Sequence, residues 1–167
     1  FPGWHIECSA MSKKLLGSTF DIHTGGEDNI FPHHECEIAQ SEGSTGTQFV
    51  RYWLHKRRID LGSEKMSKSL GNVLTLPDIV GKGYDAADLR YYLLSVHYRT
   101  NLKFTWKGMD DAKKARAKIT EWMGELESDL SGKNFGKSEA EIKVEDQMFR
   151  DSMDSDLNTS AALSYVF

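Results

Sequence analysis

The stretch Lys65-Met66-Ser67-Lys68-Ser69 places two lysines on one short loop, with one hydroxyl between them and another after them. A lysine ammonium is a compact charge on a flexible stem, so two of them can close on phosphoryl oxygens where negative charge accumulates. A solvated surface loop is the plainer alternative, because lysine usually lies exposed. The stretch also divides the chain, since helices and short strands alternate before it and helical patterns prevail after it.

The sequence before the lysine loop alternates between helical and β-biased patterns. We expect, in chain order, a helix over 5–16 that ends at Gly17, a strand over 19–23, a glycine-bearing loop over 25–29, a helix over 32–40, and β-structure over 49–54 and 58–61. Residues 56–58 form a local basic patch. In an open parallel sheet, ligands bind at the carboxyl ends of the strands, so the loop over 25–29 is a candidate ligand loop.

The sequence after the lysine loop is helical. We expect Thr75 to cap a short helix that runs to Val80, Asp85 with Asp88 to cap a helix from Ala86 to about Tyr98, and Thr105 to open the longest helix. The apolar residues expected to face inward on the longest helix are Met109, Ala112, Ala115, Ile119, Trp122, Met123 and Leu126. A loop or linker over 128–138, a helix from 142 and a break at 156–159 follow.

A second group of residues has the chemistry of a metal site. His33 and Glu37 are four residues apart, hence neighbours on one helix face, and imidazole with carboxylate is a partial ligand set for zinc. Cys8, on the inward face of another predicted helix, can supply a thiolate. The plainer alternatives are a surface hydrogen-bonded pair and a cysteine that acts as a small apolar residue. Cys36 and His34 are rival ligands on the same grounds.

Composition restricts the class of protein. With 167 residues, 39% of them hydrophobic and 28% charged, the chain is long enough for one core and is not of a disordered type. Lysine and arginine number 21 against 25 for aspartate and glutamate, so the net charge of −4 excludes a polycation. No run of about eighteen apolar residues and no secretory leader pattern occur, so we expect a cytoplasmic protein with reduced or metal-bound cysteines.

Several stretches together resemble the cysteinyl-tRNA synthetases. The lysine pentapeptide is similar, letter for letter, to the second signature of the class I aminoacyl-tRNA synthetases. The stretches that resemble the cysteinyl family are Gly3-Trp4-His5-Ile6-Glu7-Cys8-Ser9-Ala10-Met11, residues 20–23, Phe31-Pro32-His33-His34-Glu35 with Glu37-Ile38-Ala39-Gln40-Ser41, residues 91–95 and 97–99, and residues 156–159. The resemblance therefore covers nearly the whole chain.

The resemblance implies a fold and a set of segments. The expected fold class is α/β: the C-terminal half of a Rossmann-like class I synthetase catalytic domain followed by α-helical segments. Residues 1–74 would form that half-domain, 75–130 a helical connecting region that contacts the tRNA stem, and 131–167 a linker and the start of a helical tRNA-binding domain. The family's His-x-Gly-His signature, an earlier zinc-binding cysteine and the anticodon-reading region have no counterpart in the sequence.

The resemblance also implies a reaction. The family activates L-cysteine with ATP, which carries Mg²⁺, and then transfers the cysteinyl group from the adenylate to tRNA(Cys). Lys65 and Lys68 would stabilise charge on the phosphoryl oxygens of ATP. Zinc, held by Cys8, His33, Glu37 and the earlier cysteine, would bind the substrate thiolate, which the hydroxyl of serine cannot imitate.

Four further residues receive roles from the resemblance alone. Trp4 and His23 would lie close to the amino-acid substrate, and Gly26 and Asp28 would flank the adenosine of ATP, Asp28 also facing the substrate. As plain chemistry, Trp4 is equally a core aromatic, His23 a strand histidine with satisfied hydrogen bonds, and the glycines a turn. The basic stretch over 103–118 is a solvated helix face, with contact to the tRNA backbone as the alternative.

Two other functions stay open at this point. One is an ATP-dependent ligase that joins cysteine to an amino sugar; Glu37 and the helical extension after Leu74 favour the tRNA enzyme over it. The other is a catalytically inactive fragment that binds zinc or a partner. The sequence opens without Met and stops within a helical pattern, so we expect an excerpt of a longer protein, with a naturally short protein as the alternative.

The excerpt interpretation carries expectations of its own. The longer protein would be a monomer without membrane contact that binds tRNA(Cys), L-cysteine and ATP. The excerpt alone would not charge tRNA at a useful rate, because catalytic groups act together, and it would self-associate through exposed apolar surface. We also expect the loop over 65–69 to be mobile without nucleotide, because it has to close on ATP.

Overall fold

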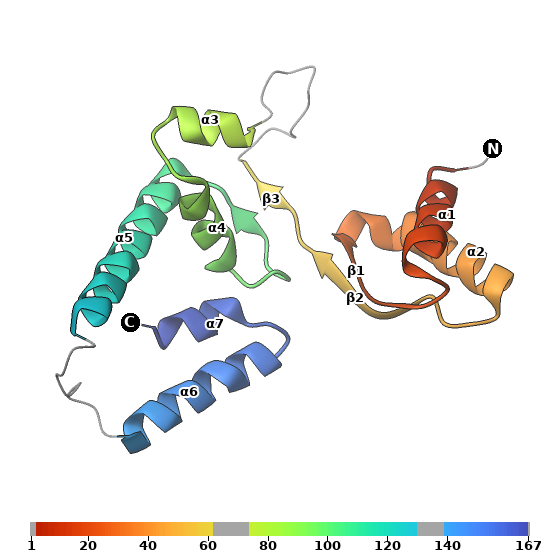
Figure 1. The fold of residues 1–167 in the computed structure, drawn as a ribbon. Coiled ribbons are helices and arrows are strands. Elements are labelled where there is room, and N and C mark those ends of the chain that lie inside the picture. Colours follow the sequence, from red (N-terminus) through yellow and green to blue (C-terminus); the bar gives the residue numbers. More distant parts are fainter. Residues whose placement is uncertain (1–2, 62–73, 130–138, 167) are drawn as a thin grey trace. The chain divides into compact units, whose positions relative to one another are not determined.

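The computed structural model describes residues 3–61, 74–129 and 139–166. Within these ranges the chain is mostly helical and contains two small parallel sheets of two strands each. It divides into two compact units, Phe1–Arg58 with Arg99–Asn101, and Ile59–Tyr98 with Leu102–Phe167. Figure 1 shows both units, each of which is described by itself below. The lysine pentapeptide lies outside the described residues.

The first unit pairs two helices with two parallel strands. Its elements are α1 (His5–Leu16), β1 (Phe20–Gly26), a short 3₁₀ turn (Glu27–Asn29), a wider turn (Ile30–His34), α2 (Glu35–Thr45) and β2 (Val50–Lys56). The strands pair from Phe20 opposite Val50 to Gly26 opposite Lys56. Parallel strands need a crossover connection, which α2 supplies, and α1 packs beside α2 (Figure 1).

Two expectations about the first unit need correction. Gly25 and Gly26 belong to β1 instead of a loop, because the parallel pairing with β2 continues to Gly26. At Gly25 a side chain would not fit, since a Cβ would come within 2.5 Å of a ring carbon of His34. The second helix begins at Glu35, later than the expected Pro32, because Ile30–His34 form a separate, wider turn in which Phe31 has an extended backbone.

The second unit is a helical assembly around an apolar core. It contains β3 (Ile59–Asp60), α3 (Leu76–Gly81), α4 (Ala86–Leu94), β4 (Leu102–Lys103), α5 (Trp106–Asp129), α6 (Glu139–Asp154) and α7 (Thr159–Ser164). Strands β3 and β4 pair in parallel. The buried cluster consists of Ile79, Tyr92, Leu102, Met109 and Ala112. These residues come from α3, α4, β4 and α5, so the core ties helices together across the sequence.

Three predicted helix starts in the second unit, at Thr75, Asp85 and Thr105, are confirmed, whereas α6 begins at Glu139, before the expected 142. Asp85 accepts a hydrogen bond from the backbone N–H of Ala87, and Asp88 accepts one from the backbone N–H of Asp85, both at 2.8 Å. This reciprocal arrangement satisfies N–H groups that a helix start leaves without partners. The helix ends earlier than expected, at Leu94 instead of about Tyr98. The predicted break at 156–159 is present between α6 and α7.

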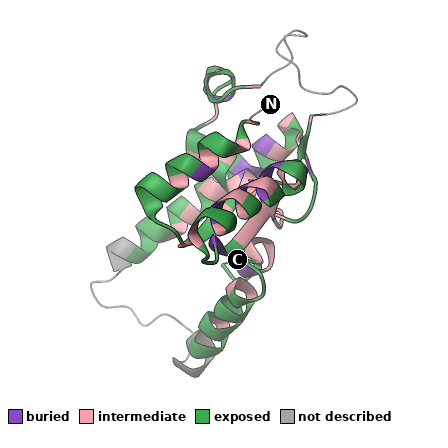
Figure 2. Cartoon of the chain, turned by 90° about the vertical axis from the view of Figure 1, so that its right-hand side faces the viewer, coloured by how far each residue is buried: buried purple, intermediate pink, exposed green. Residues whose placement is uncertain are grey.

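The inward face predicted for α5 holds for only part of the helix. Met109 and Ala112 are buried, whereas Met123 and Leu126 are 56% and 45% exposed. The reason is length: α5 has 24 residues and α4 has 9, or about 36 and 14 Å at 1.5 Å per residue. The helix that packs against α5 cannot cover its far end. Figure 2 shows how much of the described helical surface is exposed.

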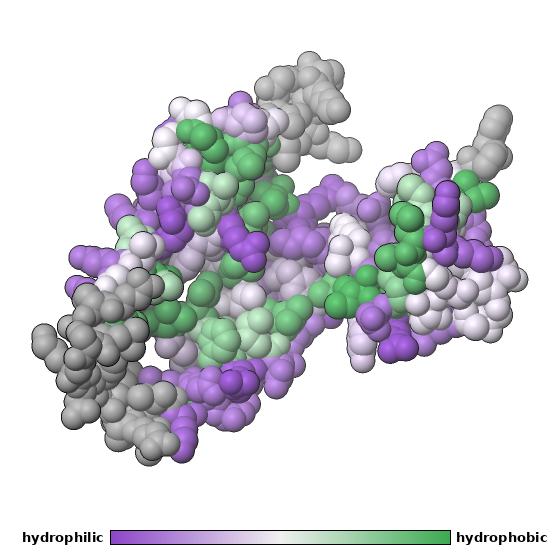
Figure 3. Space-filling model, viewed as in Figure 1, coloured by the Kyte–Doolittle hydropathy of each residue, from purple (hydrophilic) through white to green (hydrophobic). Residues whose placement is uncertain are grey.

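Large apolar side chains also lie exposed on the first unit. They are Trp4, Ile6, Met11, Leu15, Leu16, Ile22, Ile30, Phe31 and Tyr52. Figure 3 shows hydrophobic patches on the surface between hydrophilic ones. Self-association of the chain stays a prediction. Among the described residues, no helix combines the length and the apolar character that crossing a membrane requires.

Candidate metal centre

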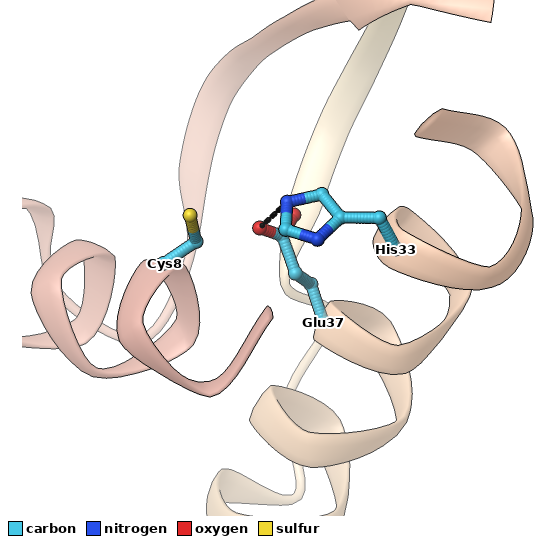
Figure 4. A group of neighbouring side chains, drawn as sticks. All are labelled: Cys8, His33 and Glu37. Atoms are coloured by element: carbon cyan, nitrogen blue, oxygen red, sulfur yellow. Dashed lines mark ion pairs between the residues drawn. The ribbon is translucent and has the colours of Figure 1, made fainter. Parts of the chain in front are cut away.

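Three side chains from three elements of the first unit come close together. Cys8 comes from α1, His33 from the turn before α2, and Glu37 from the first turns of α2. Their ligand atoms, one from each residue, all lie within 4.8 Å of one another. Figure 4 shows the Cys8 sulfur, the His33 ring and the Glu37 carboxylate directed toward a common space. The predicted convergence of these residues is therefore present.

Glu37 is the centre of this arrangement and is completely buried. Its Oε1 lies 3.1 Å from Nε2 of His33, and its Oε2 lies 2.9 Å from Nε2 of His23. Neither contact has the geometry of a hydrogen bond, so both oxygens, and Nδ1 of His33, lack an aligned hydrogen-bond partner among the described residues. Burying a polar group without such a partner is costly. A cation among these donors would remove that cost.

The donor set also fits the chemistry of zinc. Thiolate sulfur, imidazole nitrogen and carboxylate oxygen are the ligand atoms that zinc takes in proteins, and three protein ligands leave a position for a further one. Burial raises the pKa of the Cys8 thiol, and the contact with Glu37 and its negative charge raise it further. A metal-free site therefore keeps its proton on sulfur, and metal binding releases it.

A second group shares the same carboxylate. His23, His34 and Glu37 also bring one ligand atom each to within 4.8 Å of one another. The rival ligand His34 thus also lies near Glu37. Its Nδ1 lies 2.8 Å from Nε2 of His55. Burial, followed by the charges of His23, His55 and His33, lowers the pKa of His34 to about 4, so His34 is neutral at pH 7. Cys36 belongs to neither group.

Strand β2 contributes two ring systems that the sequence did not single out. Trp53 is the register partner of His23, and their rings stack at 4.5 Å with planes 18° apart. His55 pairs with Gly25 in the same register and contacts His34. The β-biased pattern predicted the strand, but only its pairing with β1 reveals these neighbours. Burial, followed by the charges of His23 and Arg99, lowers the pKa of His55.

Among the remaining predicted site residues, Trp4 and His23 adjoin this cluster, whereas Gly26 and Asp28 lie at and beyond the end of β1. Trp4 is 62% exposed and stacks on the His33 ring at 3.9 Å, so it is not a core aromatic. His23 is a strand residue whose Nδ1 lies 3.2 Å from the carbonyl of Thr24. Gly26 ends β1, and Asp28 lies in the turn that follows it. Lys65 and Lys68 lie outside the described residues.

Comparison with known proteins gives a consistent family. The family model described as "tRNA synthetases class I (C) catalytic domain" matches residues 1–114. The cysteine–tRNA ligase of Oleidesulfovibrio alaskensis is 45% identical over 172 residues, which cover 99% of this chain and 35% of the relative. The cysteine–tRNA ligase of Syntrophotalea carbinolica is 48% identical over 168 residues, covering 99% of this chain and 34% of the relative.

A third relative agrees with these two. The cysteine–tRNA ligase of Geobacter sulfurreducens is 44% identical over 172 residues, with 99% of this chain and 36% of the relative covered. The chain thus spans about a third of the length of the curated relatives it matches. All three relatives are tRNA ligases by name, and none of them favours the amino-sugar alternative.

Proposed function

The chain belongs to the family of class I (C) tRNA synthetase catalytic domains, and on this premise we propose that its protein is a cysteine–tRNA ligase. The protein activates L-cysteine with ATP to cysteinyl-adenylate and transfers the cysteinyl group to tRNA(Cys). The observation that carries the proposal is the cluster of Cys8, His33 and Glu37, which offers a thiol, an imidazole and a buried carboxylate without an aligned hydrogen bond among the described residues. The relatives' name supplies the substrate.

Cys8, His33 and Glu37 hold a zinc ion in this proposal. When bound, zinc supplies a soft acceptor for a substrate thiolate, a ligand that the hydroxyl of serine does not replace. The three side chains come from packed helical elements, so their ligand atoms are held in place before the substrate arrives. Discrimination between cysteine and serine then needs no editing step.

Other residues bind and orient the reactants. Trp4 and His23, which flank the cluster, lie beside the amino acid. Gly26 and Asp28, at the carboxyl end of β1, flank the substrate and the adenosine of ATP, which is where open parallel sheets bind ligands. Mg²⁺ accompanies the ATP.

Lys65 and Lys68 act on the phosphates in this proposal. Attack of the cysteine carboxylate on the α-phosphorus places charge on the phosphoryl oxygens and on the departing pyrophosphate. The two ammonium groups stabilise that charge, and losing one such group typically costs about 2.7–4 kcal/mol, or about 100- to 1,000-fold in rate.

The segments have distinct tasks. Residues 1–74 form the C-terminal half of a Rossmann-like catalytic domain, and the parallel pair of β1 and β2 is consistent with such a sheet. Residues 75–130 form a connecting region that contacts the tRNA stem, and residues 131–167 a linker and the start of a helical tRNA-binding domain. The long helices of the second unit suit these tasks.

Cysteine-dependent exchange between ATP and pyrophosphate tests the proposal in the full-length protein. We expect exchange with cysteine and none with serine. Cys8→Ser should abolish zinc binding and exchange together, while Cys36→Ser, which changes the other free cysteine, should leave both intact. Lys68→Ala should slow exchange about 100- to 1,000-fold with little change in cysteine affinity. Equal use of serine, or a Lys68→Ala defect confined to cysteine binding, would contradict the proposal.

A further inference from the structure

Strands β1 and β2 carry complementary charges in register. Three acidic residues of the first strand region each meet an arginine thirty positions later, the same offset as the strand register. The ion pairs are Asp21–Arg51 at 3.2 Å, Glu27–Arg57 at 3.4 Å and Asp28–Arg58 at 2.6 Å. The first pair lies near the start of the strands. The other two lie beyond the last paired residues and continue the register into the turn after β1.

The last two pairs form an arginine clasp, by which we mean Arg57 and Arg58 with Glu27 and Asp28. The clasp fastens the 3₁₀ turn Glu27–Asn29 to the segment that leaves β2. Arg58 contacts a single oxygen of Asp28, with its Nε at 2.9 Å and a terminal nitrogen at 2.6 Å from Oδ1. The pair therefore does not use Oδ2 of Asp28.

The clasp replaces the basic patch that the sequence indicated over 56–58. Both arginines face carboxylates, so their charges are balanced within the first unit. Lys56 directs its ammonium toward the carbonyl of Thr100 at 3.5 Å, and burial lowers its pKa. An anion-binding role for this segment is therefore not favoured. The contacts instead favour a role in holding the turn Glu27–Asn29.

We propose that Arg58 is a positioning residue that fixes the orientation of Asp28 at the carboxyl end of β1. With Oδ1 held by Arg58, Oδ2 accepts a hydrogen bond from a donor group of the substrates, either the ammonium of cysteine or a ribose hydroxyl of ATP. Arg57 supports the same turn through Glu27. The inference rests on the proposed function, since that function brings Asp28 to the substrates.

The expected effects are modest and measurable. Exposed ion pairs contribute little each, and the clasp residues Arg58 and Asp28 are 64% and 51% exposed at their side chains. Loss of one pair corresponds to about a 1.5- to 5-fold change in a local opening equilibrium. The effect should shrink at high salt, because salt screens exposed charges.

Amide hydrogen exchange in the full-length protein tests the clasp directly. In Arg58→Met, a peptide over residues 24–31 should exchange about threefold faster at low salt, and Arg58→Lys should restore part of the protection. Arg51→Met is the matched control, since it removes the pair at the opposite end of the same strands. Exchange in Arg58→Met equal to that of the unchanged protein would overturn the clasp.

Steady-state kinetics test the positioning role. Arg58→Met should raise the KM of one substrate about three- to fivefold with kcat nearly unchanged. A rise for cysteine assigns the ammonium to Asp28, and a rise for ATP assigns the ribose. Faster exchange of the peptide with both KM values unchanged would overturn positioning. If the unchanged protein shows no cysteine-dependent activity, the proposed function fails. The inference is then tested by calorimetric Kd values for ATP and cysteine instead of KM. Equal Kd values in Arg58→Met and the unchanged protein would overturn it.

Discussion

The two units of this chain each bury a carboxylate completely, and they treat it in opposite ways. Asp88 of the second unit and Glu37 of the first are both 0% exposed. Asp88 accepts hydrogen bonds from the Asp85 N–H at 2.8 Å and from Arg116 at 2.5 Å, whereas neither oxygen of Glu37 has an aligned hydrogen-bond partner among the described residues. Burial alone therefore does not identify a functional group. The lack of an aligned hydrogen bond within the described part of the chain distinguishes Glu37 from Asp88.

The buried residues around the two carboxylates also differ in polarity. Around Asp88 the buried residues are apolar, as the core of α3, α4, β4 and α5 shows. The buried residues of the first unit are largely polar: Ser9, His33, His34, Glu37 and Ser41, beside the apolar Phe49 and Val50. An interior of imidazoles and hydroxyls stabilises a fold less than an apolar one of equal size. It is suited to holding a ligand.

The largest expected effect separates the two carboxylates by metal binding. Glu37→Gln should lower zinc affinity by more than about 100-fold, because loss of an outer partner of a ligand already costs about 10- to 100-fold. The metal-free protein should keep its free energy of unfolding within about 1 kcal/mol, because losing the contacts with His23 and His33 is offset by no longer burying a charge. Competition with a chromophoric chelator and urea unfolding measure the two quantities.

The control for this prediction lies on the same helix. Glu35 is exposed, so Glu35→Gln should change neither zinc affinity nor stability. If Glu37→Gln instead unfolds the metal-free protein, Glu37 is a structural residue like Asp88 and the contrast between the units disappears.

The next effect concerns Asp88. Asp88→Asn should lower the free energy of unfolding by about 2 kcal/mol, because the bond to the guanidinium of Arg116 loses its charge and one oxygen becomes a poorer partner. Zinc affinity should not change. Asp111→Asn, which alters an exposed ion pair with Lys107 on α5, serves as a control and should leave stability within error. Urea unfolding followed by circular dichroism compares the variants, and a loss equal to that of the control would contradict the prediction.

The stability of the second unit at low pH should also depend on Asp88. Burial by itself raises the pKa of Asp88, but the hydrogen bonds from Arg116 and Asp85 and the charges of Arg116 and Lys113 outweigh it and hold the pKa below the ordinary 3.8. The ionised carboxylate therefore stabilises the second unit above its ordinary pKa, and this contribution is lost as pH falls through the lowered folded value. Acid unfolding curves of Asp88→Asn should lack this component. Parallel acid unfolding curves for Asp88→Asn and the unchanged protein would refute this contribution of Asp88.

The smallest expected effect comes from the helix start beside Asp88. Asp85→Ala removes the acceptor of the Ala87 N–H and should cost about 1 kcal/mol. Asp85→Asn should cost less, because asparagine is also a good residue at this position. Thermal unfolding ranks the two variants. An equal loss in both would show that the cap contributes nothing beyond the side chain's charge.

Local features of this chain were readable from the sequence. The helix starts at Thr75 and Asp85, the end of α1 at Gly17 and the break near 156–159 follow from propensity and capping, which involve neighbouring residues only. The spacing of His33 and Glu37 likewise brings their side chains together, although His33 lies in the turn before α2. These predictions hold because a helix brings residues together that are close in the sequence.

The tertiary structure decided what lies across from each of these features. The stacking of Trp53 on His23 and the pair of Asp28 with Arg58 depend on the parallel register of β1 and β2, and the contact of His23 with Glu37 joins β1 to α2. A shift of one residue would turn every side chain of one strand to the other face, and composition does not encode the choice. The same holds for the two carboxylates: the sequence contains both, and only packing against Arg116 or against imidazoles and a thiol decides which one is satisfied and which one remains for a ligand.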